Sequence, residues 1–418
     1  MHFEVVIKNA GEVVTLEGPK RTRRGEEMSD IALKKGVDIG IKGGIIAAVE
    51  SDLDGDITID AGGGVVMPGF VDPHTHLIYS GSRENELAMK LQGLSYLEIL
   101  ERGGGILSTV RKTRAASKER LIAEAERRIK TMLAFGTTTA EAKSGYGLDL
   151  ETEIRSLEVI SELNRLEKIE LIPTYLGAHA VPPEFSSPSR YIDFIIDEVL
   201  PAVKKRGLAR FVDIFCERNV FDIEDSRRFL TAAKEMGFGL KIHADEIENL
   251  GGVQVAAELG AISAEHLVKT TEREMEMMAE SGTIAVLLPG TPYSLMERDY
   301  ANARRMIEKG MAVAIATDLN PNCWTESMQF IASLSSYMMK MTPEEVITAG
   351  TINAAYAIGV GDEVGSIEVG KRADIIVLDA ENYRCLPYHF GVNLVKKVVK
   401  GGRLVVENQR YSISPPSN

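Results

Sequence analysis

The chain has 418 residues, of which 44% are hydrophobic and 26% are charged, a composition typical of a globular protein with a large core. A net charge of −13 argues against a nucleic-acid partner, and the lack of a polybasic tract argues against a membrane-surface partner. No apolar run approaches the ~20 residues that a membrane span requires. The composition therefore leaves small molecules as the expected partners.

The cysteines indicate the compartment. Cys216, Cys323 and Cys385 lie far apart and form an odd set, which is typical of reduced thiols. The start of the chain, Met1 to Glu4, lacks the basic residues and apolar core of a signal peptide. We therefore expect a cytoplasmic protein.

Both ends of the chain read as β structure. Residues 37–41 and 45–49 are predicted strands joined by a tight turn at 42–44, and residues 20–35 are expected to form an exposed, charged loop. Near the other end, residues 373–378 form a predicted strand and residues 398–406 a second glycine-turned hairpin. Neither end has enough strands for a stable sheet alone. We therefore predict that residues 1–66 and 367–418 pair into one small β-sandwich domain.

The middle, residues 67–366, alternates short apolar strands with amphipathic helices. The predicted helices include 118–135, after the candidate N-cap Ser117, and 151–166, 226–236 and 271–281. The predicted strands are 65–72, 137–143, 169–177, 211–216, 239–243, 262–266, 283–288 and 312–317. This order is typical of an α/β protein whose core is a (β/α)8 TIM barrel.

Polar residues gather where the barrel strands end, which is where such barrels carry their active sites. They are His74 and His76 after the first strand, Glu141, Lys143 and Tyr146 after the second, His179 after the third, Cys216 and Glu217 after the fourth, His243, Asp245 and Glu246 after the fifth, His266 after the sixth and Asp318 after the eighth. Of seven histidines, only His2 and His389 fall in the terminal segments. Because residues i and i+2 of a strand point the same way, His74 and His76 can reach one metal ion.

Several candidate residues, including some outside these strand ends, can also be interpreted without a functional role. A lone His-x-His can be a polar loop, Tyr96 and Tyr146 can be core aromatics, and Arg83 can be a surface arginine within Arg83-Glu84-Asn85-Glu86. Lys143 could in principle carry a carboxylate that bridges two metals, but neighbouring strand ends offer too few further ligands. We interpret it as structural.

Longer motifs carry a family resemblance over nearly the whole chain. They are Pro-Gly-Phe-Val-Asp-Pro-His-Thr-His (68–76), Leu-Gln-Gly-Leu-Ser-Tyr (91–96), Gly-Gly-Gly-Ile-Leu-Ser-Thr-Val (103–110), Lys-Ser-Gly-Tyr-Gly-Leu (143–148), Leu-Gly-Ala-His-Ala (176–180), His-Ala-Asp-Glu (243–246) and Pro-Tyr-His-Phe-Gly (387–391). With these motifs the chain resembles the amidohydrolase superfamily and, within it, the imidazolonepropionase family.

The resemblance implies a reaction and a set of roles. The implied reaction opens the ring amide of 4-imidazolone-5-propanoate to N-formimidoyl-L-glutamate, with one divalent metal, zinc or iron, per chain. The implied metal ligands are His74, His76, His243 and Asp318, and the implied substrate contacts are Arg83, Tyr96, Tyr146, His179, Glu246, His266 and Asn320. In this scheme Asp318 accepts a proton from water, His266 orients that water, and Glu246 delivers a proton to the leaving nitrogen.

One segment departs from the family pattern. After Asn320-Pro321, many members have glycine and a small hydroxyl residue, whereas this chain has Asn322-Cys323-Trp324. Two other functions stay open on sequence alone. One is another amidohydrolase, such as a purine or pyrimidine deaminase, and the other is a non-catalytic binding protein on the same scaffold. A homodimer is the expected assembly.

Overall fold

Eight parallel strands form the barrel in this computed structural model, which describes residues 2–94, 98–99, 102–166, 169–408 and 410–411. The strands are β8 (Phe70–Asp72), β9 (Thr137–Lys143), β10 (Glu170–Ala178), β11 (Phe211–Cys216), β12 (Gly239–Ala244), β13 (Ser263–His266), β14 (Ile284–Leu287) and β15 (Val313–Ile315). Each strand pairs with its neighbours in chain order. The TIM barrel is therefore confirmed.

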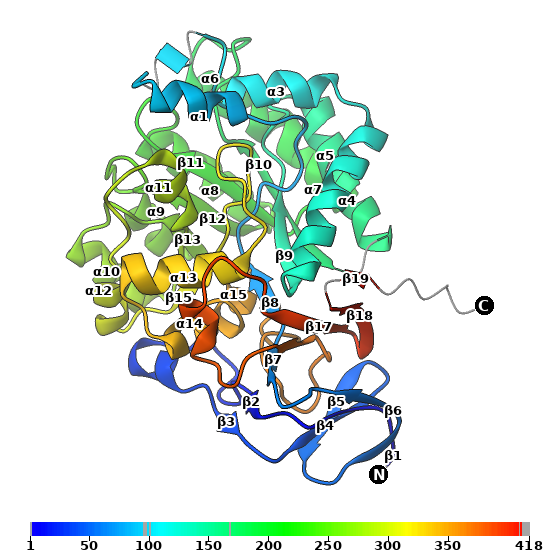
Figure 1. The fold of residues 1–418 in the computed structure, drawn as a ribbon. Coiled ribbons are helices and arrows are strands. Elements are labelled where there is room, and N and C mark those ends of the chain that lie inside the picture. Colours follow the sequence, from blue (N-terminus) through cyan, green and yellow to red (C-terminus); the bar gives the residue numbers. More distant parts are fainter. Residues whose placement is uncertain (1, 95–97, 100–101, 167–168, 409, 412–418) are drawn as a thin grey trace.

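Helices surround this barrel (Figure 1). They are α1 (Glu84–Leu91), α3 (Ile106–Ala115), α4 (Lys118–Ala134), α5 (Leu150–Leu166), α6 (Pro188–Phe194), the π-helical turn η2 (Ile195–Val199), α7 (Leu200–Arg206), α8 (Ile223–Glu235), α9 (Gly252–Leu259), α10 (Glu272–Ser281), α11 (Gly290–Leu295), α12 (Ala303–Glu308), α13 (Met328–Met339), α14 (Pro343–Ala349), α15 (Ile352–Ala357) and α16 (Cys385–Tyr388). Ser117 caps α4 as predicted, because its side chain accepts from the Arg120 N–H. Helix α8 begins three residues before the predicted bound, because Asp222 caps it. Among the described residues, no helix has the length and apolar character needed to cross a membrane.

The two chain ends form a β-sandwich. One sheet contains β1 (His2–Lys8), β4 (Asp38–Lys42), β5 (Ile45–Glu50) and β6 (Asp54–Asp60), and the other contains β2 (Glu12–Val14), β3 (Leu33–Lys34), β7 (Val65–Pro68), β16 (Ile375–Leu378), β17 (Val395–Lys400), β18 (Arg403–Glu407) and β19 (Arg410–Tyr411). N-terminal β7 pairs with C-terminal β16, and Figure 1 shows strands from both ends of the chain in the same small domain. Buried residues from both sheets, such as Ile41 and Val377, share one core.

The predicted strand 65–72 is divided between the two domains at Pro68 and Gly69. Gly69 N–H donates to Asp374 of the terminal sheet, and Phe70 N–H donates to Gly136 beside the barrel. A Cβ on Gly69 would lie 2.4 Å from Thr138 side-chain atoms, so only glycine fits where the chain changes sheets. Domain boundaries at 66/67 and 366/367 stay a prediction.

The expectation of an exposed loop at residues 20–35 is wrong. A 3-10 helix, η1 (Gly25–Ser29), lies inside this range, and Arg23 and Met28 are buried. The Thr348 hydroxyl donates to the Met28 carbonyl, so the segment packs on α14. The sequence misled because charged residues surround the two apolar anchors, Met28 and Ile31.

Candidate metal centre and active site

Four predicted ligands converge at the carboxyl ends of the barrel strands. His74 Nε2 lies 3.2 Å from His76 Nε2, which lies 3.5 Å from His243 Nε2. Asp318 Oδ1 lies 3.4 Å from His74 Nε2 and 3.3 Å from His76 Nε2. The structure thus brings together side chains that are up to 244 positions apart in the printed sequence.

The Nδ1 atoms of His74 and His243, which are the ring nitrogens away from the centre, lie against carboxylates. His74 Nδ1 faces the Glu265 carboxylate, and His243 Nδ1 lies 3.0 Å from Asp213 Oδ2. Because an ionised carboxylate can only accept, it favours the neutral tautomer that carries its proton on Nδ1, and the Nε2 lone pair of that tautomer is directed at the centre. Acidic partners of this kind fix the ring orientation of metal-binding histidines.

Asp318 adds an anionic oxygen to these lone pairs. Its Oδ2 accepts from the Thr291 hydroxyl at 2.5 Å, whereas its buried Oδ1 has no hydrogen-bond donor among the described residues. Lone pairs of His74 and His243 and a carboxylate oxygen that share one small space repel one another unless a cation lies between them. The donor set of imidazole and carboxylate fits a divalent zinc or iron ion.

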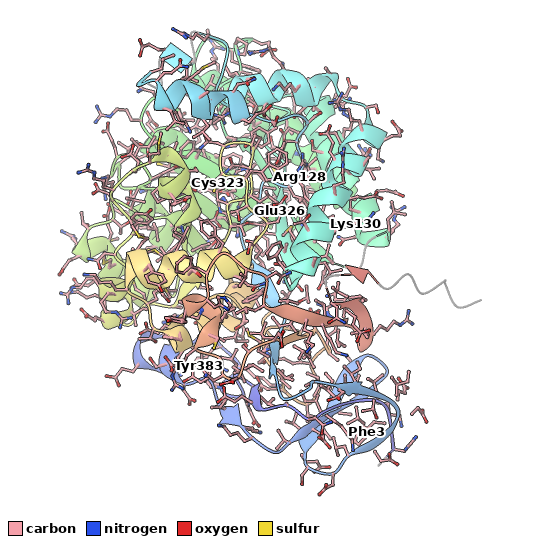
Figure 2. The ribbon with its side chains drawn as sticks, viewed as in Figure 1. Phe3, Arg128, Lys130, Cys323, Glu326 and Tyr383 are labelled. Atoms are coloured by element: carbon pink, nitrogen blue, oxygen red, sulfur yellow. The ribbon has the colours of Figure 1, made fainter. Side chains whose placement is uncertain are left out.

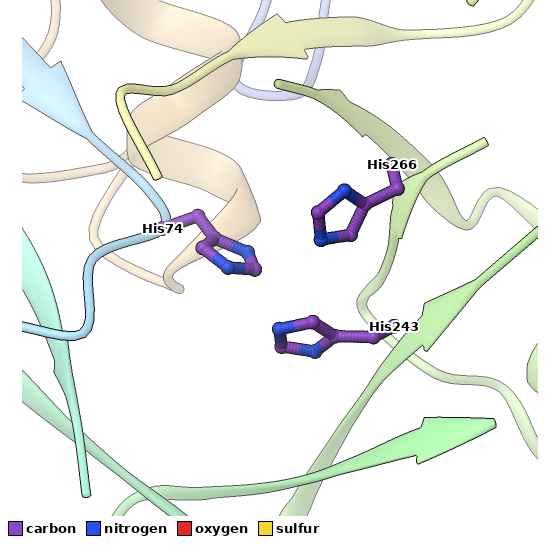
Figure 3. Close-up of side chains that lie close together, drawn as sticks. All are labelled: His74, His243 and His266. Carbon is purple, nitrogen blue, oxygen red and sulfur yellow. The ribbon is translucent and has the colours of Figure 1, made fainter. Parts of the chain in front are cut away.

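His266 borders the same centre (Figure 3). Ligand atoms of His74, His243 and His266 all lie within 4.8 Å of one another. Burial is the main cause that lowers the pKa of His266 well below its ordinary value, so its ring is neutral. His266 Nε2 lies 3.6 Å from Glu246 Oε2.

Glu246 is a carboxyl group in a mostly buried position, with 16% of its side chain exposed. Burial, and secondarily the nearby charge of Asp318, raises the pKa of Glu246 to about 8. The group is therefore mostly protonated near neutral pH and can donate a proton.

Left-handed backbone conformations coincide with these side chains. Asp245, His266, Leu267 and Asp318 have φ values of 56°, 75°, 61° and 51°. Such values are uncommon for residues other than glycine and cost about 1–3 kcal/mol each. Strain of this kind concentrates at functional sites, and here it lies at the ends of β12, β13 and β15.

Beneath the ligands lies a buried ion cluster, which we define as Glu141, Lys143, Asp213, Lys241 and Glu265. Lys143 Nζ lies 2.8 Å from Glu141, 2.7 Å from Asp213 and 3.0 Å from Glu265. Lys241 Nζ lies 2.8 Å from both Glu141 and Glu265. Burial opposes the charge of Lys143, but the carboxylates outweigh it and raise its pKa above the ordinary value.

Sequence reasoning did not single out Asp213, Lys241 or Glu265. A signal was available, since charged residues in the middle of apolar parallel strands point into a barrel rather than to solvent. Lys241 also lies two residues before His243 and so shares its face of β12.

Tyr146 and His179 form an aromatic wall beside the metal ligands. The ring of His179 stacks on His76, with centroids 4.8 Å apart, and lies 5.2 Å from Tyr146. His179 Nδ1 donates to the Gly145 carbonyl at 3.0 Å, and burial lowers its pKa well below the ordinary value. Its Nε2 is therefore a hydrogen-bond acceptor.

The remaining predicted contacts lie at the rim. Arg83 is not a surface arginine, because only 8% of its side chain is exposed and it donates to Glu86 at 2.8 and 2.6 Å. The Asn320 amide donates to the Asp318 carbonyl and accepts from Asn322 N–H. Tyr96 lies outside the described residues.

The fold has solved counterparts. An adenosine deaminase from Xanthomonas campestris, determined with bound zinc, matches with a TM-score of 0.73 and 18% identity, over 99% of this chain and 95% of that one. A 5-methylcytosine deaminase from Klebsiella pneumoniae matches with a TM-score of 0.72 and 16% identity, over 98% of this chain and all of that one. Residues 65–405 match the amidohydrolase family. The chain belongs to this family and is an enzyme of the hydrolase class.

Proteins of similar sequence identify the particular family within the amidohydrolases. The imidazolonepropionase of Alkaliphilus metalliredigens is 51% identical over 98% of this chain and 100% of that protein. The imidazolonepropionase of Bacillus cytotoxicus is 50% identical over 96% of each. The chain therefore belongs to the imidazolonepropionase family, and the resemblance seen in its motifs is confirmed.

Proposed function

We propose that the chain hydrolyses the ring amide of 4-imidazolone-5-propanoate to N-formimidoyl-L-glutamate in histidine degradation, with the residue roles given below. The observation that carries these roles is the convergence of His74, His76 and His243 Nε2 with Asp318 Oδ1 at 3.2–3.5 Å. These four residues would hold the metal. When bound, a divalent cation there lowers the pKa of a coordinated water to about 7 and polarises a carbonyl oxygen.

Two side chains transfer protons, and a third orients the attacking water. Asp318 Oδ1 accepts the proton that the attacking water loses, and the neutral ring of His266 orients the water oxygen. The carbon–oxygen bond forms as the ring carbon–nitrogen bond breaks. Glu246, protonated near neutral pH, gives its proton to the leaving nitrogen and is reprotonated as Asp318 releases its own.

Other residues hold the substrate. Tyr146 and His179 would flank the planar ring, and Asn320 would fix the loop beside it. Arg83 would bind the propanoate carboxylate, since a guanidinium recognises carboxylates in two-point fashion. The resemblance also assigns Tyr96 to this group.

We further propose one metal ion per chain, zinc or iron. Lysine carboxylation needs a neutral amine, whereas three carboxylates within 3.0 Å hold Lys143 as an ammonium ion. This supports a single cation and argues against a pair bridged by Lys143.

The decisive experiment measures the loss of imidazolonepropanoate absorbance together with metal content on the same sample. We expect turnover with one equivalent of zinc or iron. Ammonia release from adenosine or cytosine serves as the control for the deaminase alternative. Ammonia release without ring opening would overturn the proposal, and absence of both activities with full metal would favour the binding-protein alternative.

We propose a homodimer in the cytoplasm, and the three free cysteines are consistent with a reducing compartment. Light scattering on the purified protein tests the dimer.

A further inference from the structure

Lys90 extends the row of charges that begins at Arg83. Glu86 and Lys90 lie at positions i and i+4 on one face of helix α1, and Arg83, the N-cap of this helix, pairs with Glu86. Figure 1 shows α1 at the end of the barrel opposite the small β domain. Lys90 therefore belongs to the same end of the barrel as the metal ligands.

Hydrogen bonds connect Lys90 to the metal centre. Lys90 Nζ donates to Asn322 Oδ1 at 2.8 Å. Asn322 N–H donates to Asn320 Oδ1 at 2.7 Å, and Asn320 Nδ2 donates to the carbonyl of Asp318 at 2.7 Å. Three hydrogen bonds thus separate the ammonium group from a proposed metal ligand.

The loop that Lys90 contacts is held firmly. The Trp324 ring lies edge-on to Tyr79, with centroids 5.8 Å apart, and the Arg128 guanidinium lies 3.6 Å from the Tyr79 centroid. Figure 2 shows Arg128 and Cys323 in the barrel half of the molecule, away from Phe3 in the small β domain. A fixed loop keeps Asn322, and with it Lys90, at a defined position.

In the row of Arg83, Glu86 and Lys90, two cations accompany one carboxylate. Arg83 and Glu86 form a close ion pair, so their charges cancel. Half-buried Lys90 has a neutral amide as its hydrogen-bond partner and no ion pair with a carboxylate in the described part of the chain. Burial, and secondarily Arg83, lowers the pKa of Lys90, although the charge of Glu86 acts in the opposite direction. One positive charge is left for a ligand.

We propose that Lys90 binds the carboxylate of the substrate side chain and so sets specificity for anionic imidazolones, a role that rests on the proposed function. Asn322 orients the ammonium group, and Arg83, already paired with Glu86, supplies the second contact. One carboxylate on the substrate matches the one uncompensated charge. Asn322, which departs from the family pattern, is thereby assigned the role of hydrogen-bond partner to Lys90.

A tethering role is the competing explanation, because the bond to Asn322 also joins α1 to the loop. Calorimetric titration of the metal-loaded protein separates the two. The probes are imidazole-4-propanoate and 4-propylimidazole, which share the ring and differ in the carboxylate. The variants are Lys90→Met, Lys90→Arg and, as a matched control, Lys112→Met, which removes an exposed lysine that donates to the Ser82 carbonyl.

We expect the wild-type protein to bind the carboxylate probe about tenfold or more tightly than the neutral probe, the size of a charged hydrogen bond. Lys90→Met should lose most of this preference while 4-propylimidazole affinity stays unchanged. Lys90→Arg should keep part of it, and Lys112→Met should keep all of it. The KM for imidazolonepropanoate should rise in Lys90→Met with little change in kcat.

Other results overturn the inference. Equal loss of affinity for both probes in Lys90→Met would show tethering, and a preference that survives Lys90→Met would exclude Lys90 from carboxylate binding. Equal or undetectable binding of the two probes to the wild-type protein would also reject it. Failure of the wild-type protein to open imidazolonepropanoate is a separate result, which would reject the proposed function itself.

Discussion

Replacing Glu246 by glutamine tests the proposed proton transfer directly. Glutamine keeps the shape of a protonated glutamic acid and most of its hydrogen bonding, but it cannot release a proton. Because 16% of the side chain is exposed and Glu246 approaches the neutral ring of His266 only to 3.6 Å, we expect little effect on folding or metal content.

The expected loss of turnover follows from the pKa of Glu246 and from the usual contribution of a general acid. With a pKa of about 8, Glu246 is about nine-tenths protonated at pH 7. General acid–base groups contribute about 10²–10⁴-fold to turnover, so kcat of Glu246→Gln should fall by that order. The wild-type kcat should decline as the pH rises through this pKa, because the donor is then lost. A bound cation favours the ionised carboxylate, so the midpoint should lie at or below about 8.

The assay follows imidazolonepropanoate loss from pH 5 to 10, with metal analysis of each sample. Glu248→Gln is the matched control, since Glu248 lies two residues further on and pairs with Arg218, a side chain that is 62% exposed. Near-wild-type turnover of Glu246→Gln with full metal would reject the proton-transfer role. Loss of metal together with activity would instead assign Glu246 to support of the metal site.

Four further changes test other parts of the structure. Lys143→Met leaves three buried carboxylates without this cation and should lower the free energy of unfolding by about 3–5 kcal/mol in urea titrations; a change within 1 kcal/mol would contradict the ion-cluster interpretation. Buried Glu153 accepts from three N–H groups around Tyr146 at 2.7–3.2 Å, so Glu153→Gln should raise KM about tenfold, and an unchanged KM would exclude this positioning role. Chelation should abolish turnover and one equivalent of zinc or iron should restore it, whereas a need for two equivalents would reject the single-metal site. Deletion of 370–418 removes β16 from beside β7 and should give insoluble protein, and a soluble, active truncation would disprove the pairing requirement.

Much of the site could be predicted because topology converts sequence order into position. Parallel barrel strands end at one face, so residues at the ends of different strands, such as His74 and His243, had to meet. The period of the apolar residues placed the strands to within one or two residues. The division of strand 65–72 at Gly69 was not predicted, although Pro68 and Gly69 interrupt the apolar run.

Contacts between distant loops could not be predicted in the same way. The bond between Lys90 and Asn322 joins positions 232 apart in the sequence, and neither residue follows a barrel strand directly. The pairing of Arg83 with Glu86 has helical spacing and could have been expected. It was not predicted, because Arg83 was considered only as a substrate contact or as a surface arginine.

The ion cluster is better explained by orientation than by stability. Buried ion pairs contribute little net stability, since desolvation offsets their attraction. Here, however, Asp213 and Glu265 also hold the Nδ1 atoms of His243 and His74, so the lysines fix the carboxylates that fix the ligands. Counting Asp318, four carboxylates and two ammonium groups leave two negative charges, which one divalent cation neutralises. Removing a lysine would therefore disturb both ligand geometry and the charge that favours the metal, which is why charged residues occupy strand positions that packing alone would fill with valine or isoleucine.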